Sequence, residues 1–284
     1  DAQESRGLGD VYKRQSYNIM NIFTNAESLA LKQAIGISYA HGDLIAFLED
    51  DDMFALNKIY VLRGLLNHSD LDFFHNSLLP IKEHVTVSYI VPFDNSQLKF
   101  YRVNELQNKK ILKYIIRTYH PEMYNSCTVI STDLAKKCID GLHRVDINTE
   151  RFWFACALEK GRQIALTRSP LTFYRIHSQS FSQPSSEFFD VKLLERYIRS
   201  YGFMLEYFQK EIVRQVVKEQ YRLHLAHYLL YEKDNRIKKL RLALSLINDS
   251  FKFSTIYNEY SLLSGIALLS SLVSASLAKR ILYR

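Results

Sequence analysis

The most chemically suggestive segment of the chain is a run of four carboxylates, Glu49, Asp50, Asp51 and Asp52. It directly follows the apolar run Leu44–Leu48, a pattern typical of a strand buried on both faces of a parallel sheet. Ligands of open α/β sheets bind beyond the carboxyl ends of the strands, which is where these acids stand. Adjacent carboxylates repel one another unless a cation neutralises them, and their oxygen atoms suit Mg²⁺ or Mn²⁺. A solvated acidic turn is the alternative.

The segment ahead of the acids predicts the elements that position them. Asn18–Phe23 is expected to form a short strand, and Ser28–Ala40 a helix. Asn25 is expected to cap this helix, since an Asx side chain accepts a hydrogen bond from a first-turn amide, and Gly42 to end it. The buried stripe of the helix would comprise Leu29, Ala30, Ala34 and Ile37. Strand, helix and strand then make a βαβ unit.

Downstream, helices and strands alternate until a Ser-rich stretch. Helices are expected at Asn57–Asn67, Asn108–Tyr119, Thr132–Cys138 and Thr149–Lys160, and strands at Cys127–Ile130, Ile164–Thr167 and Leu171–Tyr174. Ser178–Glu187 predicts a loop or hinge, so a domain boundary is placed near residue 185. Beyond it only helices are expected, at Val191–Tyr207, Lys210–Tyr231, Arg236–Ile247 and Tyr257–Leu282.

Together, the segments around the acids resemble the family 2 glycosyltransferases of the GT-A type. In that family an Asn leads a helix ending in Ala and Gly, followed by an apolar strand and a D-x-D-D motif. Here Asn25 and Ala30–Gly36 match the first part, and Glu49, Asp51 and Asp52 fall on the motif's acids. The chain departs in having Glu at the first acid and Lys32-Gln33 in place of Arg-Asn. The resemblance implies a GT-A fold: a mixed, mostly parallel sheet flanked by helices, with an all-helical C-terminal extension.

A second segment, Tyr174-Arg175-Ile176-His177, is similar to the family's Tyr-Arg-x-His segment, which closes over the diphosphate. Arg175 can bind phosphate oxygens with two donors, and neutral His177 can ligate a metal; a polar surface loop is the alternative. The resemblance thus implies a metal site made by Asp51, Asp52 and His177. It implies donor contacts from Asn25, Lys32, Glu49, Asp50 and Arg175.

Three further positions follow from the resemblance alone. Glu150 opens a helix eleven residues before Gly161, as the family's catalytic acid does, and would be the general base. The alternative is that it only favours a helix N-terminus electrostatically. Trp153 could stack on a sugar ring or pack in the core, and Ser126 could face the acceptor or belong to a polar turn.

Composition limits the class of protein. The 284 residues, 47% hydrophobic and 24% charged, suit one large domain or one domain with a helical appendage. The net charge of +7 favours phosphorylated ligands or anionic surfaces, but no zinc-finger spacing, RNP-like motif or dense basic block indicates nucleic acid. The three cysteines, Cys127, Cys138 and Cys156, predict no disulfide framework and favour a reducing, cytoplasmic compartment.

The sequence is expected to divide into three segments. Residues 1–15 resemble a translated sequencing adaptor and are expected to be non-native; a short flexible leader is the alternative. Residues 16–185 would form a GT-A domain lacking its first strands, and residues 186–284 a helical region. Tyr260–Ala278 carries no charge but is rich in serine, so packing against other helices, an interfacial helix and a membrane span all stay open.

The resemblance implies an inverting, metal-dependent transfer of a sugar from a nucleotide diphosphate to an acceptor hydroxyl. The acceptor would be a glycan or a lipid-linked molecule, in polysaccharide, glycolipid or glycoprotein glycan synthesis. The cationic C-terminal helices could hold the protein at the inner face of the cell membrane. The alternatives are another metal-dependent nucleotidyltransferase, or a non-catalytic relative that binds glycan or membrane.

Overall fold

The computed structural model describes residues 20–68, 70–82, 89–176, 191–231, 235–252, 255–274, 277–278 and 281. Three expectations lie outside these residues: the non-native leader at 1–15, the Ser-rich loop with its domain boundary near 185, and the metal ligand His177. The described parts after residue 190 are helical, as expected, while the domain boundaries stay a prediction.

A mixed five-stranded sheet forms the centre of the protein, in the order β1-β6-β3-β7-β5. Its strands are β1 Leu44–Ala46, β6 Thr128–Ser131, β3 Leu71–His75, β7 Gln163–Leu166 and β5 Lys99–Arg102. A smaller sheet has the order β2-β8-β4, with β2 Met53–Phe54, β8 Thr172–Ile176 and β4 Leu78–Lys82. The pairs β3–β7 and β4–β8 are parallel and the other described pairs are antiparallel. The mixed sheet is therefore confirmed, without the expected predominance of parallel pairs among these strands.

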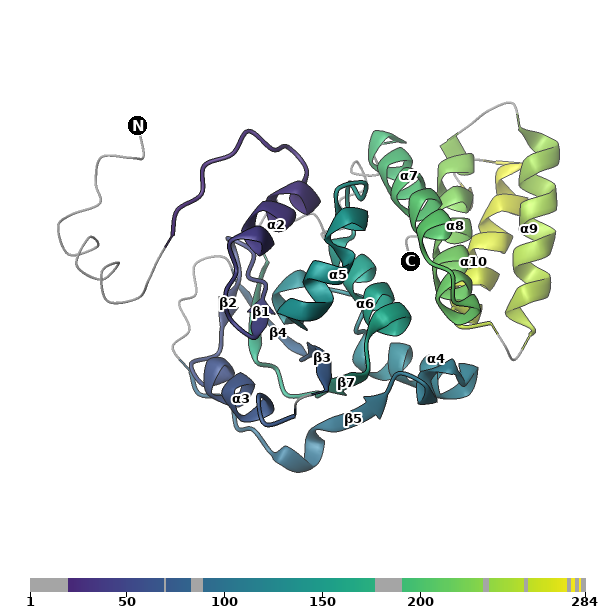
Figure 1. The fold of residues 1–284 in the computed structure, drawn as a ribbon. Coiled ribbons are helices and arrows are strands. Elements are labelled where there is room, and N and C mark those ends of the chain that lie inside the picture. Colours follow the sequence, from purple (N-terminus) through teal and green to yellow (C-terminus); the bar gives the residue numbers. More distant parts are fainter. Residues whose placement is uncertain are drawn as a thin grey trace.

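Helices cover the sheets and continue into a C-terminal layer (Figure 1). Before residue 177 they are α2 Leu29–Ser38, α3 Lys58–Leu65, α4 Lys109–Tyr119, α5 Thr132–Leu142 and α6 Thr149–Lys160, with short 3₁₀ turns at Asn95–Gln97, Glu105–Gln107 and Asn125–Cys127. After it they are α7 Val191–Tyr207, α8 Glu211–Tyr231, α9 Arg236–Ser250 and α10 Asn258–Ser271. The bounds of α6 and α7 coincide with those predicted from hydrophobic periodicity.

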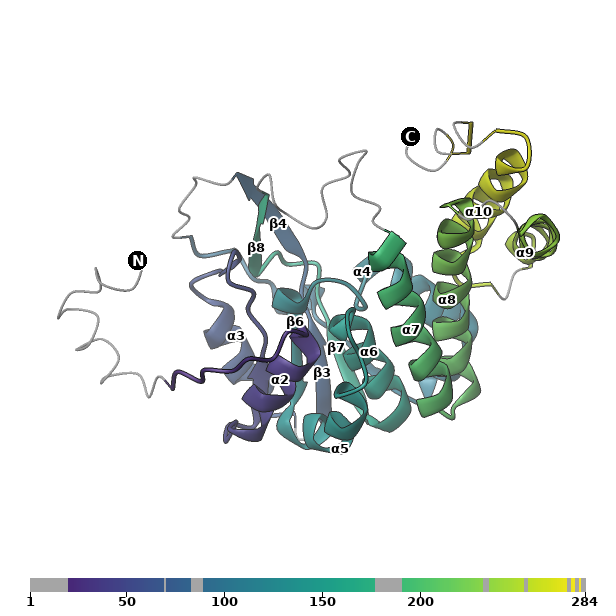
Figure 2. The same ribbon diagram turned by 90° about the horizontal axis from the view of Figure 1, so that it is seen from above.

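Successive side chains of the strands pack alternately into two separate hydrophobic cores. In β3, Phe73 packs into the larger core, whereas Phe74 packs into the smaller one. Ile130 and Val129 divide in the same way in β6, because successive side chains of a strand point to opposite faces. The smaller core includes residues of α3, and the larger one includes residues of α2, α5 and α6. These helices lie on opposite sides of the sheet (Figure 2).

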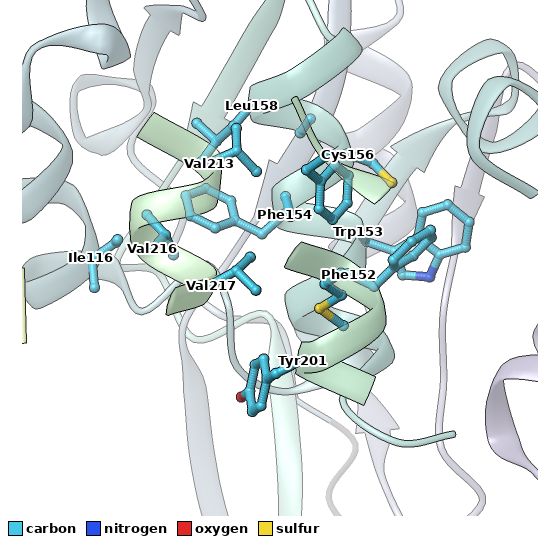
Figure 3. Close-up of a cluster of buried hydrophobic side chains, with 14 of the residues drawn as sticks. Ile116, Phe152, Trp153, Phe154, Cys156, Leu158, Tyr201, Val213, Val216 and Val217 are labelled. Carbon is cyan, nitrogen blue, oxygen red and sulfur yellow. The ribbon is translucent and has the colours of Figure 1, made fainter. Parts of the chain in front are cut away.

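Helix α6 is buried between the sheet and the C-terminal helices. Its side chains from Phe152 to Leu158 are all buried, and Phe154 contacts Phe73 of the sheet with ring centroids 5.7 Å apart. Figure 3 shows Phe154 and Leu158 of this helix beside Val213 and Val216 of α8. The N-terminus of α6, where Glu150 lies, is thus fixed from two sides.

The four C-terminal helices form a layer beside this domain, with α9 farthest from the sheet (Figures 1 and 2). The predicted helix Tyr257–Leu282 ends much earlier, at Ser271, and Leu272 caps it. Its buried residues include Ser261, Ser264 and Gly265, small side chains that allow close packing on α9. Within the described part of the chain, no helix combines the length and the apolar character that crossing a bilayer requires.

The N-terminal expectations need four corrections. Residues 20–23 carry no strand, so the described chain has no βαβ unit ahead of the acids. Ser28 rather than Asn25 caps α2, by accepting a hydrogen bond from Leu31 N at 3.1 Å, and Tyr39 rather than Gly42 ends the helix. Strand β1 lies at the edge of the sheet and pairs antiparallel with β6. Its apolar run has another cause: Ile45 packs on the larger core and Leu44 and Ala46 on the smaller.

A pair of glycine substitutions tests the docking of α7 on α5. A Cβ atom at Gly141 would lie 2.7 Å from the Tyr207 ring and 3.0 Å from Phe152, whereas one at Gly202 meets nothing within 4 Å. Both glycines are inside helices, so alanine gains helix propensity at each, about 1 kcal/mol. We expect Gly202→Ala to raise the free energy of unfolding, and Gly141→Ala to lower it by about 1–3 kcal/mol because of the clash. Urea denaturation measures both; equal effects would contradict the packing described.

Candidate functional site

Three of the four adjacent carboxylates converge in the loop between β1 and β2. Glu49, Asp51 and Asp52 each offer an oxygen atom within 4.8 Å of the others. Asp52 is buried, Glu49 and Asp51 are partly buried, and Asp50 is exposed and lies outside this group. The run is therefore a folded cluster rather than the solvated turn that was the alternative.

Hydrogen bonds from two distant segments hold the acidic loop. The Ser126 hydroxyl accepts from the Glu49 amide at 3.0 Å. On the other side, the Arg175 amide donates to the Asp52 carboxylate at 3.1 Å, and the Arg175 Nε donates to the Asp51 carbonyl at 2.9 Å. The loop also closes on itself through the Asp52 amide and the Glu49 carbonyl, 3.2 Å apart.

The Asn125 side chain joins the acidic cluster to helix α6. Its Nδ2 atom lies 3.2 Å from both Glu49 Oε1 and Glu150 Oε2, and donates one hydrogen to each carboxylate. Its Oδ1 atom accepts from Thr149 Oγ1 at 2.9 Å and from Gln33 Nε2 at 3.2 Å. The two donor and two acceptor positions of this carboxamide are all used, which fixes its orientation.

The network continues into the core through the chain's single tryptophan. Trp153 Nε1 donates to Gln33 Oε1 at 3.0 Å, and the indole stacks on Phe47 with ring centroids 5.8 Å apart. Trp153 is fully buried, so it packs in the core and does not present a face to a sugar. The substrate contact predicted for it is therefore wrong, and its role is to hold Gln33 and thus Asn125.

A buried lysine lies beneath the acids. Lys58 has no exposed surface, and its Nζ donates to the Ser126 carbonyl at 2.6 Å and to Thr172 Oγ1 at 3.1 Å. Burial lowers the pKa of this ammonium to about 7, while the charge of nearby Asp52 opposes the shift. Lys58 therefore supports the segment that carries Ser126 and adds positive potential below the cluster.

Three of the carboxyls, those of Glu49, Asp52 and Glu150, have raised pKa values. Burial raises the pKa of Glu49 to about 7; the Asn125 hydrogen bond opposes this shift, and the charges of Glu150, Asp52 and Asp51 add to it. Burial also raises the pKa of Asp52, against hydrogen bonds from Ser126 and the Arg175 amide. Burial likewise raises the pKa of Glu150. Burial and mutual repulsion both disfavour the charged form of these carboxyls, and a divalent cation with oxygen ligands would stabilise it.

The structure thus brings together Glu49, Asp51, Asp52, Glu150 and Arg175, five of the predicted site residues. Ser126 is fully buried and positions the acids, so the expectation that it faces the acceptor is wrong. Asn25 and Lys32 are exposed at α2, and the structure gives them no contact with the cluster.

Two central residues were missed by the sequence reading. Asn125, the neighbour of Ser126, carries no local signal of its own, and Lys58 is only one residue of the helix expected at Asn57–Asn67. A lysine on the apolar side of a short helix, four residues before Leu62, was the available signal for a buried cation. The bonds of Asn125 join segments 76 and 25 residues away in the sequence, so no local pattern could have revealed them.

Comparison with known proteins bears on the fold. No family model matches the sequence, and no curated protein matches it. Among solved structures, the chain is similar to two crystal structures of residues 1–349 of S. aureus TarS, one of them in complex with UDP-GlcNAc. The TM-scores are 0.50 for the complex and 0.52 for the other, each at 10% identity. The alignments cover 96% and 98% of this chain and 77% and 78% of the TarS chains.

These two neighbours are glycosyltransferases of the GT-A type, so the chain has the fold that the motif resemblance implied. At 10% identity the likeness concerns the fold, and the activity has to be argued from the site.

The raised pKa of Glu49 predicts a pH-dependent loss of stability in metal-free protein. The folded state holds the Glu49 proton up to pH of about 7, while the unfolded chain releases it near 4.5. The Glu49 contribution to the free energy of unfolding therefore falls as the pH rises between these values, by about 1–3 kcal/mol. Glu49→Gln, which is always neutral, should lack this fall and be more stable than wild type at pH 8. Denaturation in EDTA at pH 5 to 8 measures it; parallel curves for the two proteins would contradict the shift.

Proposed function

We propose that this chain is a family 2 type glycosyltransferase that moves a sugar from a nucleotide diphosphate to an acceptor hydroxyl. One observation carries the proposal: a cluster of three carboxylates is linked through Asn125 to a fourth, Glu150, on a separate helix. The reaction needs these two groups of charges, one at the leaving diphosphate and one at the acceptor. The GT-A fold is consistent with this arrangement.

Asp51 and Asp52 would hold the metal, with Glu49 as the third oxygen ligand. His177, in the segment that follows Arg175, is proposed as a further ligand. A bound Mg²⁺ or Mn²⁺ supplies positive charge that stabilises the departing diphosphate. The carboxylates are the type of donor that both ions prefer, and a bound cation would offset the burial and the mutual repulsion that raise the pKa values of Glu49 and Asp52.

Arg175 would bind the diphosphate from the opposite side. Its backbone amide and Nε both contact the acidic loop, which places the residue beside the metal ligands. A planar guanidinium suits phosphate oxygens better than any other side chain does. Lys58 would not contact the donor. It would contribute positive charge near the acidic cluster and hold Ser126 through its hydrogen bond to the Ser126 carbonyl.

Glu150 would be the general base. It would take the proton of the acceptor hydroxyl as the oxygen attacks the anomeric carbon and the bond to the diphosphate breaks, which inverts the configuration. The raised pKa of this carboxyl brings it nearer to neutral pH, where a base is most effective. Asn125 fixes the carboxylate through Nδ2 and keeps it at a set position relative to Glu49.

The acceptor is proposed to be a glycan or a lipid-linked molecule, which would bring the protein to the inner face of the membrane. The net charge of +7 supports attraction to anionic lipid headgroups. The first half of α9 concentrates such charge, with Arg236, Lys238 and Arg241 exposed.

Isothermal titration with UDP-GlcNAc, in Mn²⁺ and in EDTA, tests the donor site; GDP- and dTDP-sugars complete the panel. We expect binding in Mn²⁺ only, and a loss of at least about tenfold, or about 1.4 kcal/mol, in Asp51→Asn. Asp140→Asn removes the same charge from an exposed position on α5, outside the cluster, and serves as the matched control. If the donor binds equally well in Mn²⁺ and in EDTA, and equally well to wild type and to Asp51→Asn, the metal site is refuted. No binding of any donor by folded protein would favour the non-catalytic relative.

Substitution of the base separates chemistry from binding. Glu150→Gln keeps an oxygen that can accept from Asn125 but cannot take a proton. We expect the transfer rate to fall by about 10²–10⁴ while the donor dissociation constant stays within about twofold. Single-turnover transfer and titration of the donor measure the two quantities. An unchanged rate would show that another group accepts the proton.

A further inference from the structure

A second cavity lies between the sheet domain and the C-terminal helices, apart from the acidic cluster. Its volume is about 580 Å³, within the roughly 300–1,000 Å³ range of small-molecule sites. Its walls come from the end of α4 and the loop that follows, from Arg151 of α6, and from the facing parts of α8 and α10. The acids Glu49, Asp51 and Asp52 are not among the lining residues.

The inner wall carries polar atoms that no described residue satisfies. Glu122 is 4% exposed; its Oε1 accepts from the Tyr257 hydroxyl at 3.2 Å, whereas its Oε2 has no hydrogen-bond partner among the described residues. Within the same part of the chain, the Nε and Nη1 atoms of Arg151 are buried without an acceptor. A buried polar group without a hydrogen-bond partner destabilises the protein, so a ligand that pairs with these atoms would bind more tightly.

The charges around the cavity cancel. The four charged side chains that line it are Arg117, Glu122, Arg151 and Glu259. Arg117 and Glu259 form an ion pair at the exposed side, which leaves Arg151 opposite Glu122 inside. An anion on Arg151 would be repelled by Glu122, and a cation on Glu122 by Arg151. The balance favours a neutral ligand.

Two histidines of α8 strengthen this conclusion. Burial lowers the pKa of His224 to about 3 and that of His227 to about 4, so both rings are neutral near pH 7. His224 Nδ1 is bonded to the Gln220 carbonyl at 2.9 Å, and its ring lies against the Tyr201 ring with centroids 5.1 Å apart. The α8 wall thus adds ring surface and neutral nitrogen atoms rather than charge.

The ligand must therefore donate to Glu122, accept from Arg151 and be neutral. A hydroxyl group does both, and a molecule with neighbouring hydroxyls can satisfy the two side chains at once. Apolar side chains such as Ile116, Leu223 and Leu263 line the rest of the cavity, which suits the C–H surface of a sugar ring. We propose that this cavity binds a neutral sugar residue through its hydroxyls, at a site separate from that of the nucleotide sugar.

Backbone strain marks the two segments that bring these side chains together. His120 and Tyr124 flank Glu122 with φ of 48° and 63°, and Asn148 precedes α6 with φ of 62°. Left-handed backbone is strained at non-glycine residues and is concentrated at binding sites. The same segments carry Asn125 and Glu150, so the second site and the acidic network share their supports.

Saturation-transfer NMR and isothermal titration of the whole chain with glucose, galactose and N-acetylglucosamine test the proposal, with inorganic phosphate as the anionic probe. We expect at least one sugar to bind and phosphate to leave its binding unchanged. Arg151→Met, which removes the donors, and Leu263→Trp, which narrows the cavity without removing a polar group, should each weaken binding at least about tenfold. Thermal melts confirm that each variant is folded.

Two controls separate this site from the proposed donor site. Arg144→Met removes an arginine that pairs with Glu206 on the surface, and Asp51→Asn removes a proposed metal ligand; neither should affect sugar binding. Loss of sugar binding in Asp51→Asn, competition by phosphate, or failure of all three sugars to bind folded protein would overturn the proposal. If the chain binds a neutral sugar but no nucleotide sugar, the proposed function is refuted while the proposed sugar site is supported.

Discussion

The site depends on one carboxamide. Asn125 donates to Glu49 and Glu150 from a single nitrogen atom, and its oxygen is held by Thr149 and Gln33. Two carboxylates that would otherwise repel each other are thereby kept at a fixed separation, one in the acidic loop and one at the start of α6. Because the amide is neutral, the repulsion stays in the structure, and burial with that repulsion raises the pKa of Glu49.

The fold supplies the rigidity that this arrangement needs. Helix α6 is enclosed by the sheet and α8, and the acidic loop is tied to Ser126 and to Arg175 of β8. Lys58 supports the same segment from inside through hydrogen bonds to Ser126 and Thr172, and forms no ion pair with a carboxylate among the described residues. The protein thus holds closely spaced carboxylates on a well-supported scaffold, which is the condition for binding a metal and a charged leaving group with little reorganisation.

Local patterns predicted the elements well where one face or the whole helix is buried, as in α6, α7 and β6, and the acidic run located the cluster. They failed where contacts between residues distant in the sequence determine whether a strand forms. Residues 20–23 are apolar enough for a strand but carry none, and β3 at the sheet centre was missed because Asp72 and His75 interrupt its apolar run. Asp72 is buried because Arg162 and Ser131 bond to it, partners that only the tertiary structure brings close.

The central claim is that the acidic cluster holds a metal against the donor diphosphate. Anomalous diffraction from crystals grown with Mn²⁺ and UDP-GlcNAc tests it most directly, because the manganese signal locates the ion independently of any activity. We expect a manganese peak bonded to Asp51 or Asp52, with the diphosphate on the ion and Arg175 alongside. A diphosphate bound elsewhere, or a cluster without manganese while nucleotide is bound, would contradict it.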